Sequence, residues 1–414
     1  MADGCACDRH VNMYLTVSEA VQRGLSVAHP VAETETLPLQ QAIGRVLAED
    51  CSSRVDMPAF DNSAMDGYAI RTRDLGDGPV FDLPIGGRVA AGDSGAHTAP
   101  VGSVLRIFTG APIPPEFDAV VMQEDCEGSA DHIRFTRRPE PGQHIRRAGE
   151  DLKAGAPILR RGCEIGAREA AVLASSGHGH VSVYRKLKVT IFSTGSELRQ
   201  PDEALGPGQI YNSNRYMLLA LLDRPWIKLT DRGPIADDPA LLKNVLREAC
   251  ETSDMIITTG GVSVGDEDHM PRLFSEIGGE TDVMKVAMKP GKPVMFGRYG
   301  DALYIGLPGN PVSAFVTWRV IGSKMMNRRA GLRDTPLVSE QAVLAEPLHR
   351  RAGRQEFRPV RIEGSTSGGF PLLRLLAASY SGRVALLAQA DGLAIIPAET
   401  EYLPEGHVLE FHRF

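Results

Sequence analysis

Strand and helix patterns alternate through the second half of the chain, and this rhythm constrains the fold more than any other feature. Between residues 187 and 334, short apolar runs typical of buried strands alternate with amphipathic runs typical of helices. The expected strands are 188–192, 226–230, 255–258 and runs around Val283, Val294 and Tyr304; the expected helices are 214–222, 239–250, 271–277 and 312–326. This alternation predicts a doubly wound, largely parallel sheet, whose ligands bind at the carboxyl ends of its strands.

The rest of the chain has a different character. Thr16–Glu19 is a capping box that predicts a helix ending near Ala28, and residues 39–48 and 169–176 have helical periodicity. Residues rich in Gly, Pro and Asp, with short β-like runs, lie between these helices and again at the C-terminus. We therefore predict an α/β multidomain protein with a helical domain (1–50 and 148–186), an inserted β-rich domain (51–147), a doubly wound α/β domain (187–334) and a C-terminal β-barrel-like domain (335–414).

Bulk composition excludes several classes of function. The 414 residues are too many for one compact core, and the net charge of −7 argues against nucleic acid as the main partner. No apolar run reaches the roughly eighteen residues of a membrane span, and the N-terminus lacks a signal-peptide pattern. Six scattered cysteines without a C-x-x-C motif predict reduced thiols in a cytoplasm.

Each expected strand of the parallel sheet runs into polar or glycine-rich sequence. Glu197 follows the first strand, Asp237 follows the second, and the third leads into Gly260, Gly261 and Asp268. Glycines before a helix form a cradle for phosphate, and carboxylates beside phosphates hold Mg²⁺ or bind a heterocycle or ribose. The alternative for each carboxylate is a simple helix cap.

Two proline- and glycine-rich turns lie further along the α/β domain. Residues 288–293 and 307–313 combine prolines, which fix φ, with glycines, which let backbone donors approach a ligand. With Lys289 and Lys292 they predict a rigid anion-binding surface; two ordinary turns are the alternative. In the inserted domain, residues 58–69 pack aspartates among apolar anchors, which predicts either a ligand site or an elaborate Asx-turn.

Five of these segments together resemble the signature segments of one family, molybdopterin molybdenumtransferase of the MoeA type, similar to the gephyrin and plant Cnx E domains. The matching segments are 61–69, 109–112, 260–265, 289–293 and 307–313, in the family's order along nearly the whole chain. The resemblance implies a molybdenum insertase that takes molybdate and adenylylated molybdopterin, hydrolyses the adenylate with Mg²⁺, and releases AMP and molybdenum cofactor. It also implies an elongated, four-part subunit and a homodimer, with each active site between the α/β domain of one subunit and the inserted domain of the other.

The resemblance also assigns residues by matching position. The implied catalytic residues are Asp66, Thr109, Asp151, Glu197, Asp237, Asp268, Lys285 and Lys289, and the implied metal ligands are Asp237, Asp268 and Glu197. The implied substrate-binding residues are Gly260, Gly261, Ser263, Lys292, Pro308, Asn310, Pro311, Ser313, Arg354 and Ser381. The candidate protein partners are a molybdopterin adenylyltransferase and the molybdoenzymes that receive the product.

Two departures from the family pattern touch the site. Ser196 stands where many relatives have an acidic residue, and residues 269–271 replace an aromatic-x-Lys pattern, so a basic group at that helix start is in doubt. Three other functions compete: a molybdopterin adenylyltransferase, which resembles residues 187–330 alone, a non-catalytic scaffold, and a generic mononucleotide enzyme. The inserted and C-terminal domains argue against the first, and the retained acidic and lysine residues argue against the second.

Overall fold

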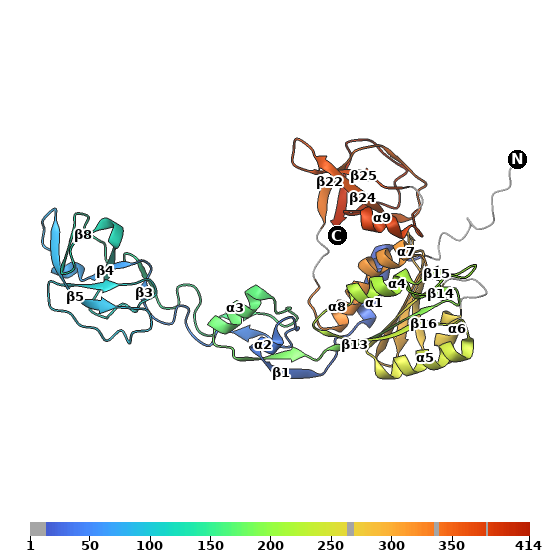
Figure 1. Ribbon diagram of the computed structural model, residues 1–414, viewed down its shortest axis with the longest axis horizontal. Coiled ribbons are helices and arrows are strands. Elements are labelled where there is room, and N and C mark those ends of the chain that lie inside the picture. The colour runs from blue at the N-terminus through green and yellow to red at the C-terminus, as the bar shows by residue number, and fades with distance from the viewer. Residues whose placement is uncertain (1–13, 263–268, 335–338, 378–379) are drawn as a thin grey trace.

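The computed structural model describes residues 14–262, 269–334, 339–377 and 380–414 (Figure 1). The chain is elongated. The inserted domain lies at one end, and the α/β and C-terminal domains lie together at the other. The multidomain α/β architecture predicted from the sequence is confirmed, whereas the exact domain boundaries remain a prediction.

A six-stranded sheet forms the centre of the α/β domain. Its spatial order is β16 (Ile227–Ile235), β13 (Leu187–Thr194), β17 (Met255–Thr259), β21 (Ala302–Leu307), β20 (Pro293–Tyr299) and β18 (Glu280–Lys285). The first four strands are parallel, and β20 runs antiparallel to both of its neighbours, β21 and β18. Because the chain turns from β13 to β16 on one side and returns to β17 on the other, the sheet has a switch point between β13 and β17.

Helices cover both faces of this sheet because successive strand residues point to opposite sides. Ile191 and Ile257 pack under one layer of helices, whereas Phe192 and Ile256 pack under the other. The first layer contains α1 (Val17–Val27), α4 (Ser213–Leu221), α7 (Pro311–Thr317), a π-helical turn (Trp318–Gly322) and α8 (Ser323–Arg329). The second layer contains α5 (Pro239–Thr252) and α6 (Met270–Glu276). The capping box of Thr16 and Glu19 begins α1 as predicted.

A smaller unit joins the α/β domain to the inserted domain. It contains the antiparallel pairs β1 (Thr34–Pro38) with β12 (His180–Tyr184) and β2 (Cys51–Ser52) with β11 (Pro157–Leu159), and the helices α2 (Leu39–Ala42) and α3 (Ala167–Ser175). The predicted helix over 39–48 is wrong beyond Ala42. Gly44 has a φ of +76° and its N–H donates to the carbonyl of Ile165, so the chain leaves the helix there.

The inserted domain is a second six-stranded sheet. Its order is β7 (Ala119–Met122), β4 (Gly67–Ile70), β6 (Val104–Ile107), β5 (Phe81–Val89), β9 (His132–Phe135) and β8 (Glu127–Gly128). Two short helical turns (Thr72–Asp74 and Gln123–Asp125) and the pair β3 (Asn62–Ser63) with β10 (Ile145–Arg146) complete it. Its two apolar clusters contain residues of the inserted segment only, which is how an independently packed domain is built.

The C-terminal domain is a closed five-stranded barrel. The strands β24 (Gln355–Ser365), β25 (Pro371–Leu375), β22 (Glu340–Leu344), β28 (Val408–Arg413) and β26 (Gly392–Ile396) follow one another, and β26 pairs back to β24. The pair β23 (Leu348–His349) with β27 (Tyr402–Leu403) and the helix α9 (Val384–Gln389) accompany it. A short strand of the α/β domain, β19 (Met288–Lys289), pairs with β24 and joins the two domains.

One half-buried ion pair ties the α/β domain to the chain that enters it. The two guanidinium nitrogens of Arg185 lie 2.6 and 2.8 Å from the carboxylate of Asp254, which also accepts from Lys188 N at 2.7 Å. Burial alone would raise the pKa of Asp254, but these hydrogen bonds outweigh it and hold the pKa below its ordinary value. The stabilisation is therefore present above the ordinary carboxyl pKa of about 4 and is lost as pH falls through the lower, folded value.

We predict that Asp254→Asn destabilises the protein by about 2–3 kcal/mol at pH 7, because the partly buried charge of Arg185 then keeps only the exposed carboxylate of Glu33 as its partner. The variant should also lose less stability than the wild type on acidification. Urea-unfolding midpoints followed between pH 7 and pH 3 measure both effects. Glu340→Gln, in the exposed pair with Arg413, is the control and should leave the urea midpoint at pH 7 nearly unchanged. A wild-type midpoint that rises as pH falls would contradict this account.

Candidate functional site

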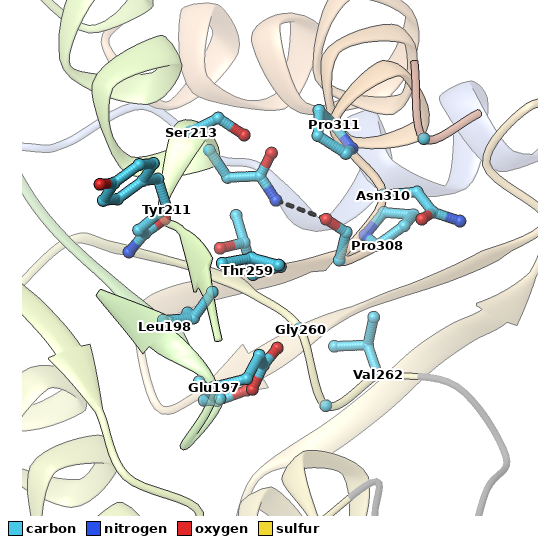
Figure 2. Close-up of a pocket in the computed structure, with 18 of the residues that line it drawn as sticks. Glu197, Leu198, Tyr211, Ser213, Thr259, Gly260, Val262, Pro308, Asn310 and Pro311 are labelled. Atoms are coloured by element: carbon cyan, nitrogen blue, oxygen red, sulfur yellow. Dashed lines mark hydrogen bonds between the residues drawn. The ribbon is translucent and has the colours of Figure 1, made fainter. Parts of the chain in front are cut away.

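A cavity of about 700 Å³ lies at the carboxyl ends of the parallel strands. Loops after β13, β16, β17 and β21 form its walls, together with the short parallel pair β14 (Leu198–Arg199) and β15 (Ile210–Tyr211). Figure 2 shows Glu197, Gly260 and Asn310 contributing from three loops, and Tyr211 from β15, around this space. The cavity therefore occupies the switch point at which the sequence predicts a ligand.

Glycine is required at the floor of the cavity. Gly260 and Gly261 directly follow β17 and have φ values of +89° and +66°. A Cβ on Gly260 would meet the carbonyl oxygen of Thr194 at 2.6 Å, so the loops after β13 and β17 approach too closely for any side chain. Both glycines line the cavity, so their backbone can be approached closely by a ligand that enters it.

Two asparagines fix the cavity wall next to α4, and sequence reasoning missed them. The side-chain oxygen of Asn212 accepts from Arg215 N at 3.2 Å, which caps α4, and from the Ser193 hydroxyl at 3.3 Å. Asn214 Nδ2 donates to the Gly309 carbonyl at 2.8 Å, the dashed line in Figure 2, and so holds the loop after β21. The helix-cap pattern of Asn212 was the only signal in the sequence, and it gives no hint of the contact with Gly309.

The neighbouring carboxylates Asp237 and Asp238 have different tasks. Asp238 Oδ1 accepts from the N–H groups of Ala240 and Leu241 and caps α5. Asp237 accepts from Ser196 N at 2.8 Å, and its own N–H donates to the Ser196 hydroxyl at 3.1 Å. These reciprocal bonds hold the loops after β13 and β16 together, and Asp237 and Glu197 both line the cavity. The helix-cap alternative thus applies to Asp238.

The loop after β21 supplies another wall of the cavity. Pro308, Asn310 and Pro311 line it, as the sequence predicts, and Figure 2 shows them together on one side. Ser313 lies one turn into α7 and is only 4% exposed, so the structure places it behind this wall. The Ser381 carbonyl accepts from Val312 N at 3.1 Å, which brings the C-terminal domain to the same loop.

Basic groups gather at the junction of the α/β and C-terminal domains. Lys292 lies 4.9 Å from the ring centre of Tyr14, and Lys285 and Arg354 are also close enough to act on that residue. The hydrogen bond with Lys292 lowers the pKa of Tyr14, with smaller contributions from the charges of Lys292, Lys285 and Arg354. Tyr14 and Lys292 are thus neighbours at this junction, and Tyr14 is a member that the sequence did not indicate.

Lys289 belongs to the same junction but has a carboxylate partner. Its ammonium is 3.2 Å from Glu356 Oε1, across the paired strands β19 and β24, and 5.7 Å from the ring centre of Tyr380. The sequence predicted Lys289 as a site residue and gave no indication of Glu356 or Tyr380. Both partners come from the C-terminal domain, whose register against β19 no local pattern reveals.

The predicted residues of the inserted domain form a separate group. Asp66 precedes β4 and Thr109 follows β6, and these strands are antiparallel neighbours, so the two residues meet at one end of the sheet. Asp66 Oδ1 accepts from both the N–H and the hydroxyl of Thr109, at 2.7 Å each. These bonds, backbone first, lower the pKa of Asp66, with a smaller contribution from the charge of Arg106. Asp66 is therefore an ionised carboxylate held in one orientation at neutral pH.

Asp151 lies apart from the Asp66–Thr109 pair. It is exposed and lines a hollow of about 490 Å³ with Asp56 and Glu150, where the inserted domain joins its neighbour. Asp61, in the same signature segment as Asp66, accepts from Ala148 N and pairs with Arg147 at 2.6 Å. The Asx-turn alternative thus describes Asp61 well, because its oxygens are used within the fold.

Apart from Asp151, the predicted residues described by the structure therefore belong to two regions, the inserted domain at one end of the chain and the α/β and C-terminal domains at the other (Figure 1). Glu197, Asp237 and the two glycines surround the cavity of the α/β domain, with the lysines at its junction with the C-terminal barrel. Asp268 and Ser263 lie outside the described residues. Within the described ranges, no three His, Cys, Asp or Glu side chains form a group placed to hold a metal. None of the helices in these ranges is long and apolar enough to cross a membrane.

Three family descriptions match consecutive parts of the chain. Residues 15–177 match the MoeA N-terminal region (domain I and II), and residues 190–328 match the probable molybdopterin binding domain. Residues 341–414 match the MoeA C-terminal region (domain IV). Together they cover the cavity, the inserted domain and the barrel.

Individual relatives are similar over most of their length. A molybdopterin molybdenumtransferase of Haemophilus influenzae is 38% identical over 83% of this chain and 85% of its own. Molybdopterin molybdenumtransferase 2 of Mycobacterium tuberculosis is 35% identical over 91% and 94%, respectively. The crystal structure of a molybdopterin biosynthesis moeA protein from Pyrococcus horikoshii superimposes with a TM-score of 0.81 at 29% identity, covering 97% of this chain and 100% of that one.

Proposed function

Because this chain belongs to the molybdopterin molybdenumtransferase family, we propose that it transfers molybdenum from molybdate to adenylylated molybdopterin. In the proposed reaction, hydrolysis of the adenylate depends on Mg²⁺ and releases AMP together with molybdenum cofactor. The observation that carries the proposal is the polar cavity at the switch point, with Gly260 and Gly261 on its floor and Glu197 and Asp237 on its walls. A volume of about 700 Å³ is within the range of small-molecule sites.

The carboxylates of this cavity fit a magnesium ion bound with substrate. Mg²⁺ prefers oxygen ligands, keeps several waters, and in phosphate sites is held by one or two carboxylates plus the phosphates themselves. Glu197 and Asp237 supply such oxygens on neighbouring loops, and Asp268 follows the glycine loop in the sequence. When bound, the ion supplies positive charge that offsets the charge of the diphosphate. The reciprocal bonds of Asp237 with Ser196 keep the two loops in register for this role.

The rest of the cavity suits an elongated pterin nucleotide. The glycine backbone allows phosphates to approach the ends of β13 and β17, and the loop of Pro308, Asn310 and Pro311 forms a rigid opposite wall. Thr194, Asn212 and Asn214 each keep one buried polar atom without a hydrogen bond in the described structure. A wall of this polarity favours a heterocycle with hydrogen-bonding edges over an apolar ligand.

The basic junction is the proposed molybdate site. Molybdate is a tetrahedral dianion, and it needs fixed cationic and hydroxyl donors. Lys292 lies beside Tyr14 there, the charges of Lys285 and Arg354 act on the same phenol, and Ser381 lies at the adjoining loop. Lys292 directly precedes Pro293, which lines the cavity, so the proposed molybdate and pterin sites adjoin. Ser313 contributes from behind the wall, in support of the loop.

The functional unit is proposed to be a homodimer. Asp66 and Thr109 belong to the inserted domain, at the far end of the subunit from the cavity (Figure 1). Asp151 lies where the inserted domain joins the neighbouring unit. A second copy arranged with two-fold symmetry would bring its inserted domain to this cavity. Because the arrangement is symmetric, the inserted domain of each subunit would complete the cavity of the other. The fixed, ionised carboxylate of Asp66 then acts on the substrate beside the partner's Glu197 and Asp237 loops.

The chief rival is a molybdopterin adenylyltransferase. Its expected likeness is confined to the α/β domain, whereas the MoeA matches also cover residues 15–177 and 341–414, which include the inserted domain and the barrel. The cysteines within the described residues are free thiols, which is consistent with the cytoplasmic location proposed here: Cys51, Cys126, Cys163 and Cys250. A cytoplasmic location and transfer of the product to molybdoenzymes remain parts of this proposal.

The reaction can be reconstituted with purified protein. Incubation with adenylylated molybdopterin, molybdate and MgCl₂ should release AMP, measured by chromatography, and yield cofactor that activates an apo-molybdoenzyme. Omission of molybdate or Mg²⁺ should prevent cofactor formation. A protein that instead consumes ATP and molybdopterin, without any need for molybdate, would be the adenylyltransferase.

A further inference from the structure

Glu356 is the most deeply buried charged side chain at the junction of the α/β domain and the barrel. It lies on β24, opposite Lys289 of β19, and its side chain is 0% exposed. A carboxylate withdrawn so completely from water costs folding energy unless several partners compensate it. Those partners show what its burial achieves.

Its first oxygen holds groups from two domains. Glu356 Oε1 lies 3.2 Å from the Lys289 ammonium of the α/β domain and accepts from the Tyr380 hydroxyl at 2.8 Å. Tyr380 is itself 2% exposed, and its ring lies beside the same ammonium. The next residue, Ser381, binds the start of α7 through its carbonyl. One oxygen atom therefore fixes both Lys289 and the chain that carries Ser381.

Its second oxygen balances a guanidinium. Oε2 lies 3.3 Å from Arg350 Nε, an ion pair without hydrogen-bond alignment, and the Arg350 side chain is only 5% exposed. The Arg350 donors are used instead on the backbone carbonyls of Arg351, Pro397 and Arg354. Arg350 thereby holds the backbone of Arg354, and Glu356 supplies the charge that lets Arg350 stay buried there.

Three residues at the junction of the α/β domain and the barrel are thus linked to Glu356, one directly and two through a single intermediate residue. Lys289 is reached directly, Arg354 through Arg350, and Ser381 through Tyr380. One carboxylate also faces two cations, so the cluster keeps a net positive charge beside Lys285, Lys292 and Arg354. We propose that Glu356 is a positioning residue that sets the geometry of a tetrahedral-oxyanion subsite between the α/β domain and the barrel.

This inference deepens the proposed function and rests on it for the identity of the anion. Glu356→Gln keeps the size and one acceptor oxygen but removes the charge that holds Lys289 and Arg350. We expect the KM for molybdate to rise about tenfold, the usual effect of losing a partner that orients a binding group. The kcat and the KM for adenylylated molybdopterin should change by less than about twofold, because Glu356, Lys289 and Arg350 do not line the cavity of the α/β domain.

Whether the KM for molybdate rises or falls in Glu356→Gln distinguishes a positioning role from simple charge neutralisation. Removal of a negative charge would by itself tighten anion binding. A fall in the KM for molybdate would therefore mean that Glu356 only neutralises Lys289, and it would overturn the proposal. An equal rise in the KM for both substrates, as expected of general damage, would overturn it as well.

Two further variants keep the test sharp if Glu356→Gln folds poorly. Tyr380→Phe keeps the ring beside Lys289 and removes only the hydroxyl bound to Glu356, so the KM for molybdate should rise about threefold. In a Lys289→Met background, the additional change Glu356→Gln should raise the KM for molybdate clearly less than it does in the wild type, because Glu356 acts through Lys289. Fully multiplicative effects, or an unchanged KM in Tyr380→Phe, would contradict the proposed role. Glu340→Gln on the same barrel is the control.

Calorimetric titration with sodium molybdate examines the same subsite without turnover. A wild type that binds molybdate, with weaker binding by Glu356→Gln, supports the subsite even if the proposed reaction is absent. If the wild type forms cofactor, and Glu356→Gln binds molybdate as tightly as the wild type, this inference is rejected and the proposed function still stands. Absence of molybdate binding by the wild type rejects the subsite altogether.

Discussion

Asp66→Ala is expected to lower the rate of cofactor formation at least about a hundredfold while leaving the protein folded. The carboxylate lies at the end of the inserted sheet, outside its apolar clusters, and its hydrogen bonds are to Thr109 alone. Its loss therefore removes a fixed, ionised group with little change in packing. Cofactor formation is measured in the reconstituted reaction, and folding by the urea midpoint.

Asp82→Ala provides the matched control for Asp66→Ala. Asp82 is an exposed aspartate of the same sheet, and its ion pair is with Arg134 at 2.7 Å. Its replacement should leave cofactor formation within about twofold and stability within about 1 kcal/mol. Full activity of Asp66→Ala, or an equal loss of activity in both variants, would contradict the proposal that the inserted domain contributes Asp66 to the active site.

Asp237→Ala is the second substitution with a large expected effect. We predict a loss of at least about a hundredfold in cofactor formation, because the variant lacks a cavity carboxylate that, in the proposed reaction, faces the diphosphate and Mg²⁺. The variant should also need more Mg²⁺ for its residual activity. A titration of MgCl₂ at saturating substrate measures this requirement.

The adjacent residue separates this role from helix stability. Asp238→Ala removes the cap of α5 and should cost about 1 kcal/mol of stability, with activity nearly unchanged. Asp237→Ala should show the reverse pattern. Equal activities of the two variants across the Mg²⁺ titration would exclude Asp237 from the proposed metal site.

The sequence predicted those elements of the fold whose signals are local. The strand–helix rhythm indicated the doubly wound sheet, and the capping box of Thr16 indicated the start of α1, because periodicity and caps depend on neighbouring residues. The helix over 39–48 failed for the converse reason. Its apolar spacing is helical, yet Gly44 takes a left-handed conformation that a contact with Ile165, far along the chain, makes favourable.

In the candidate site, too, only residues with a local sequence signal could be placed from the sequence. Glycines and carboxylates directly after strands could be placed at the switch point, because the carboxyl ends of parallel strands share one edge. Glu356, Tyr380 and Tyr14 were missed, since each acquires its role by contact with a distant strand or turn. No spacing rule connects Glu356 to Lys289 across 66 intervening residues, and only the pairing of β19 with β24 does so.

The central claim is that each active site combines the cavity of one subunit with Asp66 of another, and mixed dimers test it most directly. Asp66→Ala and Asp237→Ala proteins, each inactive alone, are unfolded together, refolded as a mixture and assayed for cofactor formation. In a shared site, half of the dimers are mixed and each contains one intact site, so activity should return to about a quarter of the wild-type value. A mixture as inactive as its two components would show that both aspartates serve within one chain and would contradict the account.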